Sequence, residues 1–360
     1  MRTFVQWLRL MRFPLVFTAI GDAWAVRFMA PSEPGASYGF AYGNPTISDL
    51  AVFAGISFCL YAFGMILNDV MDAGKDPQNK PIPCGAIDRS AAAMAAIASL
   101  FVAVTLAFRY DLQHDLRLAF GDADSGIGPF VNLNPLVLVI VAGAAILIFL
   151  YDVGLKRIPL LGLLLLGLIR AVHCQIPAVT NGEWNGPAWN SLFLFAHVTV
   201  VSWIAYNWEG KQPRIRRVER WALAFAVVLI GFALFDVFNL SKVKVELGPD
   251  SDSLGTIPAA QFLIFPLIAA GVYLVILFWI LASRRFPTGP DKGRAAMRIG
   301  LLWLLVYDAA FCAAAGRWTG VMAEAALLAC AILSSRGMMW LSHRVGLVAP
   351  KTIGDDSKSR

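Results

Sequence analysis

Residues 68–76 read Asn-Asp-Val-Met-Asp-Ala-Gly-Lys-Asp; they end a long apolar run and precede a proline, which predicts a helix that stops here. Asn68, Asp72 and Asp76 recur every four residues, and Asp69 precedes Asp72 by three, so a helix would carry all four on one stripe. Neighbouring carboxylates repel one another, and the partial negative charge at a helix carboxyl terminus adds to that repulsion. The stripe therefore predicts a bound cation.

Oxygen ligands of this kind suit Mg²⁺, which keeps several waters and bridges carboxylates to substrate phosphates. The next segment contains Lys80 followed by Pro-Ile-Pro, a rigid basic loop able to contact such phosphates. A solvated helix end with ordinary turn residues would explain any single aspartate, but it explains the whole string poorly. We therefore expect Asp69, Asp72 and Asp76 to be catalytic and, together with Asn68, to hold Mg²⁺.

The composition indicates a membrane protein. The 360 residues are 58% hydrophobic and 15% charged, whereas soluble proteins average about 45–50% and about 25%. The five cysteines are odd in number and scattered without a C-x-x-C pair, so neither a disulfide framework nor a zinc site is expected. The net charge of +6 does not indicate nucleic-acid binding, because the basic residues lie between apolar runs rather than in a patch with interleaved aromatic residues.

A spanning helix needs about 20 apolar residues, and the chain offers about ten such stretches. We expect an all-α fold, a polytopic transmembrane bundle of about nine to ten spans in the lipid bilayer, with one domain at 1–345 and a polar cytoplasmic tail at 346–360. The basic start and Ala-Trp-Ala at 23–25 could also mark a signal peptide, but the apolar run continues past them, which favours an uncleaved first span. The expected spans lie near 13–30, 46–68, 90–108, 134–151, 158–179, 190–208, 219–240, 259–282, 298–316 and 319–340.

The distribution of Lys and Arg predicts the orientation. Of the 30 basic residues, 23 lie at the amino terminus, in the loops that follow the even-numbered spans and at the carboxyl terminus. Six lie on the opposite side, and Arg170 lies within a span. We therefore expect an integral membrane protein with its acidic stripe facing the cytoplasm.

Arg170 is costly inside a membrane, so we expect it to face the bundle interior with a carboxylate or phosphate partner. Its place about eight residues into the span makes snorkelling to the surface the less favoured explanation. Asp22 and Asp308 are also intramembrane, and the alternatives of lining a cavity and of packing helices both stay open. Glu324 is expected to be structural.

The acidic stripe and residues 79–85, Asn-Lys-Pro-Ile-Pro-Cys-Gly, resemble the first aspartate-rich motif of the UbiA superfamily of intramembrane prenyltransferases. Residues 9–14 resemble the basic lead-in of that family, and residues 151–156, Tyr-Asp-Val-Gly-Leu-Lys, resemble its Y-x-x-x-L-K segment. The resemblance implies a helical bundle around a central cavity, in which Mg²⁺ supports transfer of an isoprenoid from its diphosphate to an acceptor.

The family's second acidic motif, D-x-E-G-D, is altered here to Asn207-Trp-Glu209-Gly-Lys211. Under the resemblance, Asn207 and Glu209 would support one ion, while Lys211 would meet the diphosphate directly as a point charge. Decay of catalysis is the alternative. Residues 151–156, the altered motif and residues 305–316 together resemble a UbiA branch found in Ebo-type bacterial gene clusters. This resemblance implies a bacterial inner membrane.

The leading hypothesis is transfer of an isoprenoid from a polyprenyl diphosphate to a lipophilic, aromatic or hydroxyl-bearing acceptor, with Mg²⁺ neutralising the departing diphosphate. The residues expected to hold the metal are Asn68, Asp69, Asp72, Asp76 and Glu209. Those expected to bind the diphosphate are Asn68, Lys80, Lys156, Arg170, Asn207, Glu209 and Lys211.

Two other functions stay open. The first is a non-catalytic isoprenoid or metabolite carrier on the same fold, which the lysine at position 211 motivates. The second is an ion-coupled transporter that uses Asp22, Arg170 and Asp308. The transporter hypothesis does not explain an acidic stripe at the membrane edge rather than at the midplane.

Overall fold

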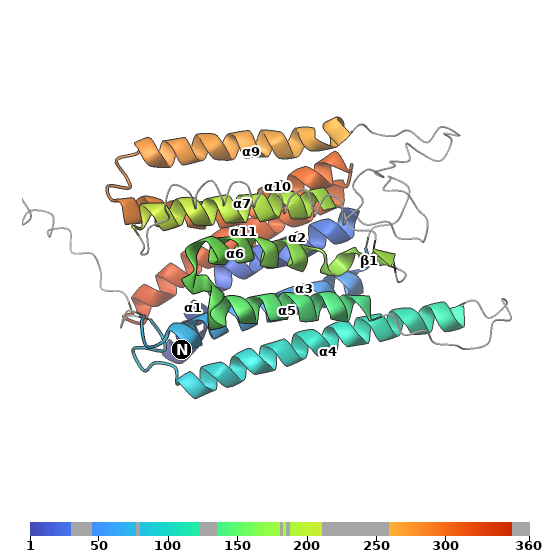
Figure 1. The fold of residues 1–360 in the computed structure, drawn as a ribbon, viewed down its shortest axis with the longest axis horizontal. Coiled ribbons are helices and arrows are strands. Elements are labelled where there is room, and N and C mark those ends of the chain that lie inside the picture. The colour runs from blue at the N-terminus through green and yellow to red at the C-terminus, as the bar shows by residue number, and fades with distance from the viewer. Residues whose placement is uncertain are drawn as a thin grey trace, which may run out of the picture.

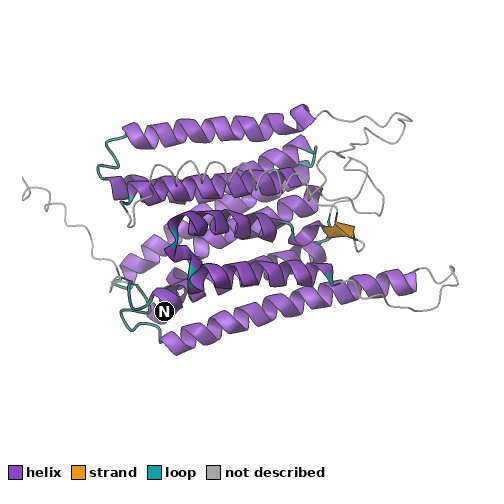
Figure 2. Cartoon of the chain, viewed as in Figure 1, coloured by secondary structure: helices purple, strands orange, loops and turns teal. Residues whose placement is uncertain are grey.

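The structure is a computed structural model that describes residues 1–29, 45–76, 80–121, 135–180, 183–184, 188–210 and 259–347. Helices make up nearly all of it (Figures 1 and 2). Two short strands, β1 (Val179–Thr180) and β2 (Glu183–Trp184), pair antiparallel at one end. The helices are α1 (Arg2–Leu10), α2 (Val16–Met29), α3 (Ile47–Asp72), α4 (Arg89–Gly121), α5 (Leu136–Val153), α6 (Pro159–Cys174), α7 (Ala188–Trp208), α9 (Ala259–Ala282), α10 (Gly289–Ala314) and α11 (Trp318–Arg344), with 3₁₀ turns η1 (Phe13–Leu15), η2 (Leu155–Arg157) and η3 (Ile176–Ala178).

Eight of the described helices, α3 to α7 and α9 to α11, are long and apolar enough to cross a membrane. Large apolar side chains point outward from the peripheral ones: Phe101 on α4 and Phe278 on α9 are each 71% exposed. Lipid would cover such side chains, since water tolerates large apolar patches poorly. The expected all-α polytopic membrane bundle is confirmed.

The first predicted span is shorter than expected. Its helix α2 has 14 residues, and it follows a separate 3₁₀ turn in which Arg12 has a left-handed backbone at φ 47°. The predicted start of the ninth span at 298 is also wrong, because α10 begins at Gly289. There the Thr288 side chain caps the helix by accepting a hydrogen bond from the Asp291 N–H at 3.2 Å. The predicted span 219–240 and the tail after 347 lie outside the described residues.

The centre of the bundle is α2, which packs against α3, α6, α10 and α11. Small residues let these neighbours approach closely, as is common in membrane helices. Ala19, Ala23 and Ala25 are almost completely buried. This central position gives the short helix α2 contacts on most of its surface.

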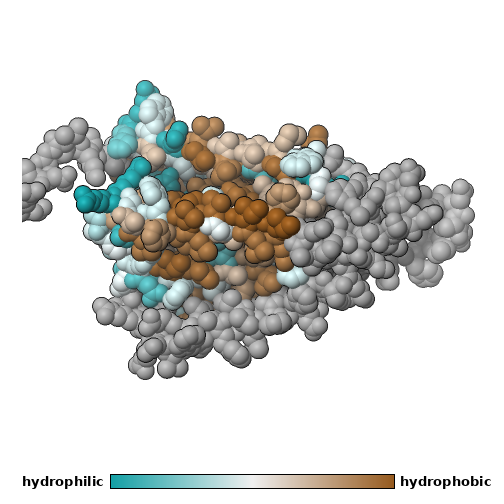
Figure 3. Space-filling view, turned by 90° about the horizontal axis from the view of Figure 1, so that it is seen from above, coloured by the Kyte–Doolittle hydropathy of each residue, from teal (hydrophilic) through white to brown (hydrophobic). Residues whose placement is uncertain are grey.

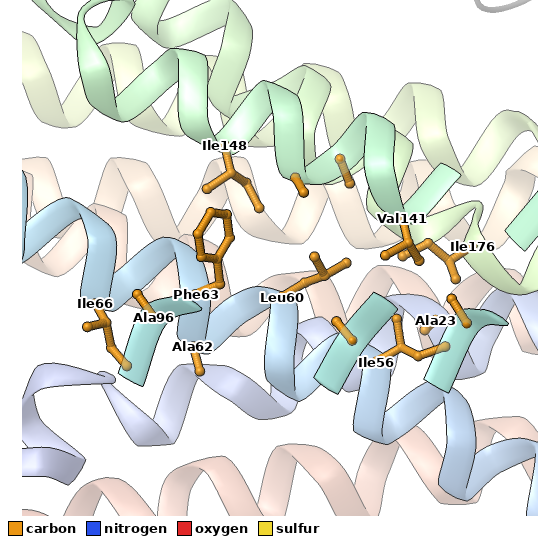
Figure 4. Close-up of a cluster of buried hydrophobic side chains, with 14 of the residues drawn as sticks. Ala23, Ile56, Leu60, Ala62, Phe63, Ile66, Ala96, Val141, Ile148 and Ile176 are labelled. Carbon is orange, nitrogen blue, oxygen red and sulfur yellow. The ribbon is translucent and has the colours of Figure 1, made fainter. Parts of the chain in front are cut away.

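The main apolar core joins α3, α4 and α5. In Figure 4, Ile148 of α5 points toward Phe63 of α3, and Leu60 lies further along the same helix. Gly64 keeps the two helices close, because a Cβ at that position would lie 3.2 Å from the Ile148 methyl group. This core holds the carboxyl ends of α3 and α5 side by side, and the polar side chains that follow them are positioned by it.

The helices α3, α5 and α7 run in the same direction, so their carboxyl ends lie at one end of the bundle, on the left in Figure 1. We call it the charged end; it comprises these helix ends and the connecting residues 73–76, 80–88 and 154–158. In Figure 3, hydrophilic side chains gather at the left, whereas hydrophobic ones cover the middle of the face shown. The bundle thus has an apolar middle and a polar end that carries the acidic stripe.

Candidate functional site

The carboxyl end of α3 carries Asn68, Asp69 and Asp72, but Asp76 lies beyond the end of the helix, so the prediction that one helix carries all four residues is wrong for Asp76. Asp69 is buried, with 5% of its surface exposed, and α3 ends at Asp72. The N–H groups of Lys75 and Asp76 both donate to the Asp72 carbonyl, at 2.8 and 2.9 Å. These bonds satisfy a carbonyl that a helix end would otherwise leave without a partner, and they turn the chain so that Asp76 stays near Asp69.

Lys80 joins two of the three aspartates. Its Nζ donates to Asp69 Oδ1 at 3.2 Å and to Asp76 Oδ2 at 2.7 Å. A second cationic group, the Arg12 guanidinium, lies 3.9 Å from Asp69 Oδ1. Both cations follow a helix: Arg12 comes after α1 and Lys80 after α3. Together they neutralise Asp69 and Asp76.

The loop that carries Lys80 is held in place by its own turn and by the core. The N–H groups of Ala86 and Ile87 donate to the Pro81 carbonyl at 3.0 and 3.1 Å, and Gly85 takes the left-handed φ of 71° that the turn requires. Ile82 is 8% exposed and belongs to the core of α3, α4 and α5. The rigidity that the Pro-Ile-Pro sequence predicted therefore has a physical basis.

Lys156 neutralises the third aspartate of the stripe, Asp72, as Lys80 neutralises Asp69 and Asp76. Its Nζ donates to Asp72 Oδ2 at 2.7 Å and to Asp152 Oδ1 at 3.3 Å. Asn68 also donates to Asp152 Oδ1, at 2.9 Å. The start of α6 packs on the Lys156 backbone, because a Cβ at Gly162 would lie 3.0 Å from the Lys156 Cα. The close packing of α6 thus fixes the position of the Lys156 backbone.

The structure therefore brings together six of the predicted residues in one network, which we call the lysine–carboxylate site. Within it, the cation that the stripe requires is an ammonium group: Lys80 lies between Asp69 and Asp76, and Lys156 between Asp72 and Asp152. In the part of the chain that the structure describes, no three carboxylate, imidazole or thiol groups are arranged to hold a metal ion. The predicted residues are Asn68, Asp69, Asp72, Asp76, Lys80 and Lys156.

Arg170 is not part of this site. It lies well inside the bundle on α6, ion-paired with Asp22, and it donates to the Thr18 hydroxyl at 2.7 Å. The prediction that it faces the interior with a carboxylate partner is confirmed. The further prediction that it binds a diphosphate is not supported, because its guanidinium is engaged with α2.

The altered second motif lies at the carboxyl end of α7, also at the charged end. Asn207 donates to the carbonyl of Trp203 one turn earlier, at 2.9 Å. Glu209 lies against α10, since a Cβ at Gly293 would lie 2.9 Å from its Cγ. These contacts involve α7 and α10 rather than α3. Lys211 lies outside the described residues.

Two residues of the site were missed by the sequence analysis, Asp152 and Arg12. Asp152 precedes Lys156 by four residues, the spacing at which helical side chains of opposite charge meet, so its pairing was readable from the sequence. Its contact with Asn68, 84 residues earlier, was not. The sequence showed Arg12 only as part of a basic segment near the amino terminus. Its left-handed backbone conformation is seen only in the structure.

No protein-family model matches the chain. No curated protein matches it either. Among solved structures, it is similar to a digeranylgeranylglyceryl phosphate synthase at 16% identity, covering 88% of this chain and 99% of that one, with a TM-score of 0.49. It is also similar to a UbiA homologue from Archaeoglobus fulgidus at 14% identity, covering 89% and 99%, with a TM-score of 0.48. The same homologue bound to GPP and Mg²⁺ matches at 13% identity, covering 91% and 98%, with a TM-score of 0.40. At such identities, only the side chains of the site can indicate the chemistry.

Proposed function

We propose that this protein is an intramembrane prenyltransferase that moves an isoprenoid from a polyprenyl diphosphate to an aromatic or hydroxyl-bearing acceptor. The bond between the allylic carbon and the diphosphate oxygen would break, a bond from that carbon to the acceptor would form, and the acceptor would lose one proton. The lysine–carboxylate site at the charged end would receive the diphosphate, and the apolar bundle would receive the isoprenoid chain.

The observation that carries this proposal is the pairing of two lysines with two pairs of carboxylates. Each ammonium can exchange one carboxylate contact for a phosphate oxygen, since both groups accept charge-assisted hydrogen bonds of similar length. Lys80 is 30% exposed and Lys156 15%, so both can be reached from the charged end. The site therefore offers positive charge to an anion while its own carboxylates remain close by.

The donor set also suits Mg²⁺. If Lys80 turned to a diphosphate, it would release the oxygens of Asp69 and Asp76 that it now contacts. If Lys156 did the same, it would release Asp72. The released oxygens could then bind a hard cation. Asn68 adds an amide oxygen next to them. When bound, the ion would neutralise the charge that develops on the departing diphosphate.

Other predicted residues enter the proposal differently. Asn207 and Glu209 would support the metal ion near the diphosphate, and Lys211 would meet the diphosphate directly. We leave Arg170 out of the diphosphate set because of its ion pair with Asp22. We further propose that residues 1–345 act as one unit in the membrane and that the charged end faces the cytoplasm, as the bias of basic residues predicts.

The test is binding of farnesyl and geranylgeranyl diphosphate to the protein in lipid nanodiscs, with and without Mg²⁺. The native protein should bind at least one of them in a Mg²⁺-dependent manner, and Asp72→Asn should weaken this binding about tenfold or more, because an ionised metal ligand is lost. Asp88→Asn is the matched control. Asp88 is an exposed carboxylate at the same end that accepts from the Ala91 N–H at 3.0 Å to cap α4, and asparagine caps equally well.

Equal weakening by both variants would show a loss of general surface charge rather than of a site. Native protein that binds neither diphosphate at any Mg²⁺ concentration would refute the proposal. Binding would also justify a screen of acceptors, with turnover as the readout.

A non-catalytic carrier is the second candidate, because the carboxylates are already neutralised by lysines as in a purely structural network. A carrier would show no turnover across the acceptor screen. Lys211→Asp separates the two further: it restores an acid to the second motif and should change the Mg²⁺ dependence of an enzyme, whereas a carrier indifferent to the diphosphate should not respond.

A further inference from the structure

A second polar cluster lies inside the bundle, away from the lysine–carboxylate site. Asp22 of α2, Asp308 of α10 and Glu324 of α11 are each 0% exposed, and we call them the buried triad. Arg170, which pairs with Asp22, lies 11 residues into α6, about 17 Å along the helix from its start beside Lys156. The triad therefore belongs to the interior, where water does not solvate it.

The three carboxyl groups interact with one another. Asp22 and Asp308 are close enough to interact electrostatically, and so is Glu324 with both of them. Gly21 allows this approach, because a Cβ there would lie 2.6 Å from Glu324 Oε2. Three ionised carboxylates this close would repel one another.

The positive charge at the triad is too small for three carboxylates. Among the described residues, the cation that pairs with it is Arg170. Arg27, further along α2, is paired with Asp49 at 3.1 Å, and Arg317 interacts with Cys312. If all three acids were ionised, the interior would hold two uncompensated negative charges, which a low-dielectric environment strongly disfavours.

The remaining groups around the triad supply no further charge. His173, one turn after Arg170 on α6, is 6% exposed, and neither of its ring nitrogens has a hydrogen-bond partner. Both carboxyl oxygens of Glu324 also lack hydrogen-bond partners in the described part of the chain. The other neighbours are Asn190 of α7, which donates to Asp308 Oδ1 at 3.2 Å, and the thiols of Cys174 and Cys312.

We propose that the buried triad is a proton-binding site: Asp22 is ionised against Arg170, and Asp308 and Glu324 each hold a proton at neutral pH. The ligand of this site is the proton itself.

This assignment fixes how stability depends on pH. The folded chain would hold two protons that ionised aspartate and glutamate release in the unfolded chain at neutral pH. Unfolding would release them, so the folded state loses stability as the pH rises, and the unfolding equilibrium constant rises about tenfold per pH unit for each proton. An ionised triad would give no such contribution near neutral pH.

The direct test is infrared spectroscopy of the full-length protein in nanodiscs at neutral pH, reading the C=O band of protonated carboxyl groups. We expect Asp308→Asn and Glu324→Gln each to remove part of this band and to keep the fold, because an amide imitates a protonated acid. Asp22→Asn should leave the band unchanged and destabilise the protein, because Arg170 loses its partner. Asp49→Asn, at the ion pair with Arg27, is the control that should leave the band unchanged.

Two further readings keep the proposal testable if some variants fold poorly: the infrared band of the native protein, and the pH dependence of unfolding of those variants that fold. Native protein with no protonated-carboxyl band at neutral pH would overturn the proposal without any variant. If the variants do fold, the double variant Asp308→Asn/Glu324→Gln should lose about two protons from the pH dependence of unfolding. An unchanged dependence would equally overturn the proposal. None of these readouts depends on prenyl transfer, so the proposed function can fail while this inference holds.

Discussion

Asp152 links the two sides of the lysine–carboxylate site. Its side chain is 2% exposed and meets both Lys156 and Asn68. A carboxylate this deeply buried must be paired, because desolvation penalises its charged form. Lys156 therefore has a structural role in its contact with Asp152 and a functional role in its contact with Asp72. Substitutions can separate these two roles.

Lys156→Met should destabilise the protein by about 1–3 kcal/mol, because it leaves Asp152 without its cation while the Asn68 hydrogen bond remains. Thermal or SDS-induced unfolding in detergent would measure the loss. Lys75→Met, at an exposed lysine of the same end, is the control and should change stability little. Adding Asp152→Asn to Lys156→Met should recover most of the loss; no recovery would show that Asp152 is not the group left unpaired.

Lys80→Met should weaken diphosphate binding about tenfold, since one charge-assisted contact is lost. It should affect folding less than Lys156→Met does, because Lys80 is more exposed and its partner Asp69 retains Arg12 nearby. Isothermal titration with farnesyl or geranylgeranyl diphosphate would give the affinity. An affinity equal to that of Lys75→Met would argue against a role of Lys80 in the diphosphate site.

At the scale of the elements, glycines set the distances between helices. The sequence showed Gly167 inside an apolar run, where it costs helix propensity. The structure shows why it is there: a Cβ at Gly167 would lie 2.7 Å from the Phe195 carbonyl oxygen of α7. Membrane helices gain stability from such close backbone approach, which no local pattern reveals.

Gly167→Ala should therefore push α6 away from α7 and destabilise the bundle by about 1–3 kcal/mol through overpacking. Gly143→Ala on α5 is the matched control, because nothing lies within 4 Å of the Cβ position there, and it should be neutral or slightly stabilising. Unfolding midpoints of the two variants provide the comparison. Equal midpoints would contradict the close contact.

At the scale of the whole molecule, α3, α5 and α7 run in the same direction, so their carboxyl ends lie at one end (Figure 1). The bias of basic residues predicts that this end faces the cytoplasm. Two exposed cysteines, Cys84 and Cys330, can be used to test this orientation. Cys84 lies in the loop of the charged end, whereas Cys330 lies in the middle of α11, where lipid would cover it.

A membrane-impermeant maleimide should therefore label Cys84 in inside-out vesicles and not in right-side-out vesicles. Cys84→Ser should abolish the labelling, because Cys59 and Cys330 lie in the middle of α3 and α11, where the bilayer shields them, and Cys174 and Cys312 are buried. Mass spectrometry of the labelled peptide would identify the site. Labelling of Cys84 in right-side-out vesicles would reverse the proposed orientation.

The sequence by itself determined that the chain is a helical membrane bundle and where most spans lie, because hydropathy and helical spacing are local properties. It also indicated that Asp69, Asp72 and Asp76 lie together at a membrane boundary and need positive charge nearby, although the helix that was expected to carry all three ends at Asp72. The tertiary structure decided what supplies that charge, since Lys156 reaches Asp72 across 84 residues of chain. It also decided that Asp22, Asp308 and Glu324 meet around one arginine, because only packing brings residues of four helices to one point.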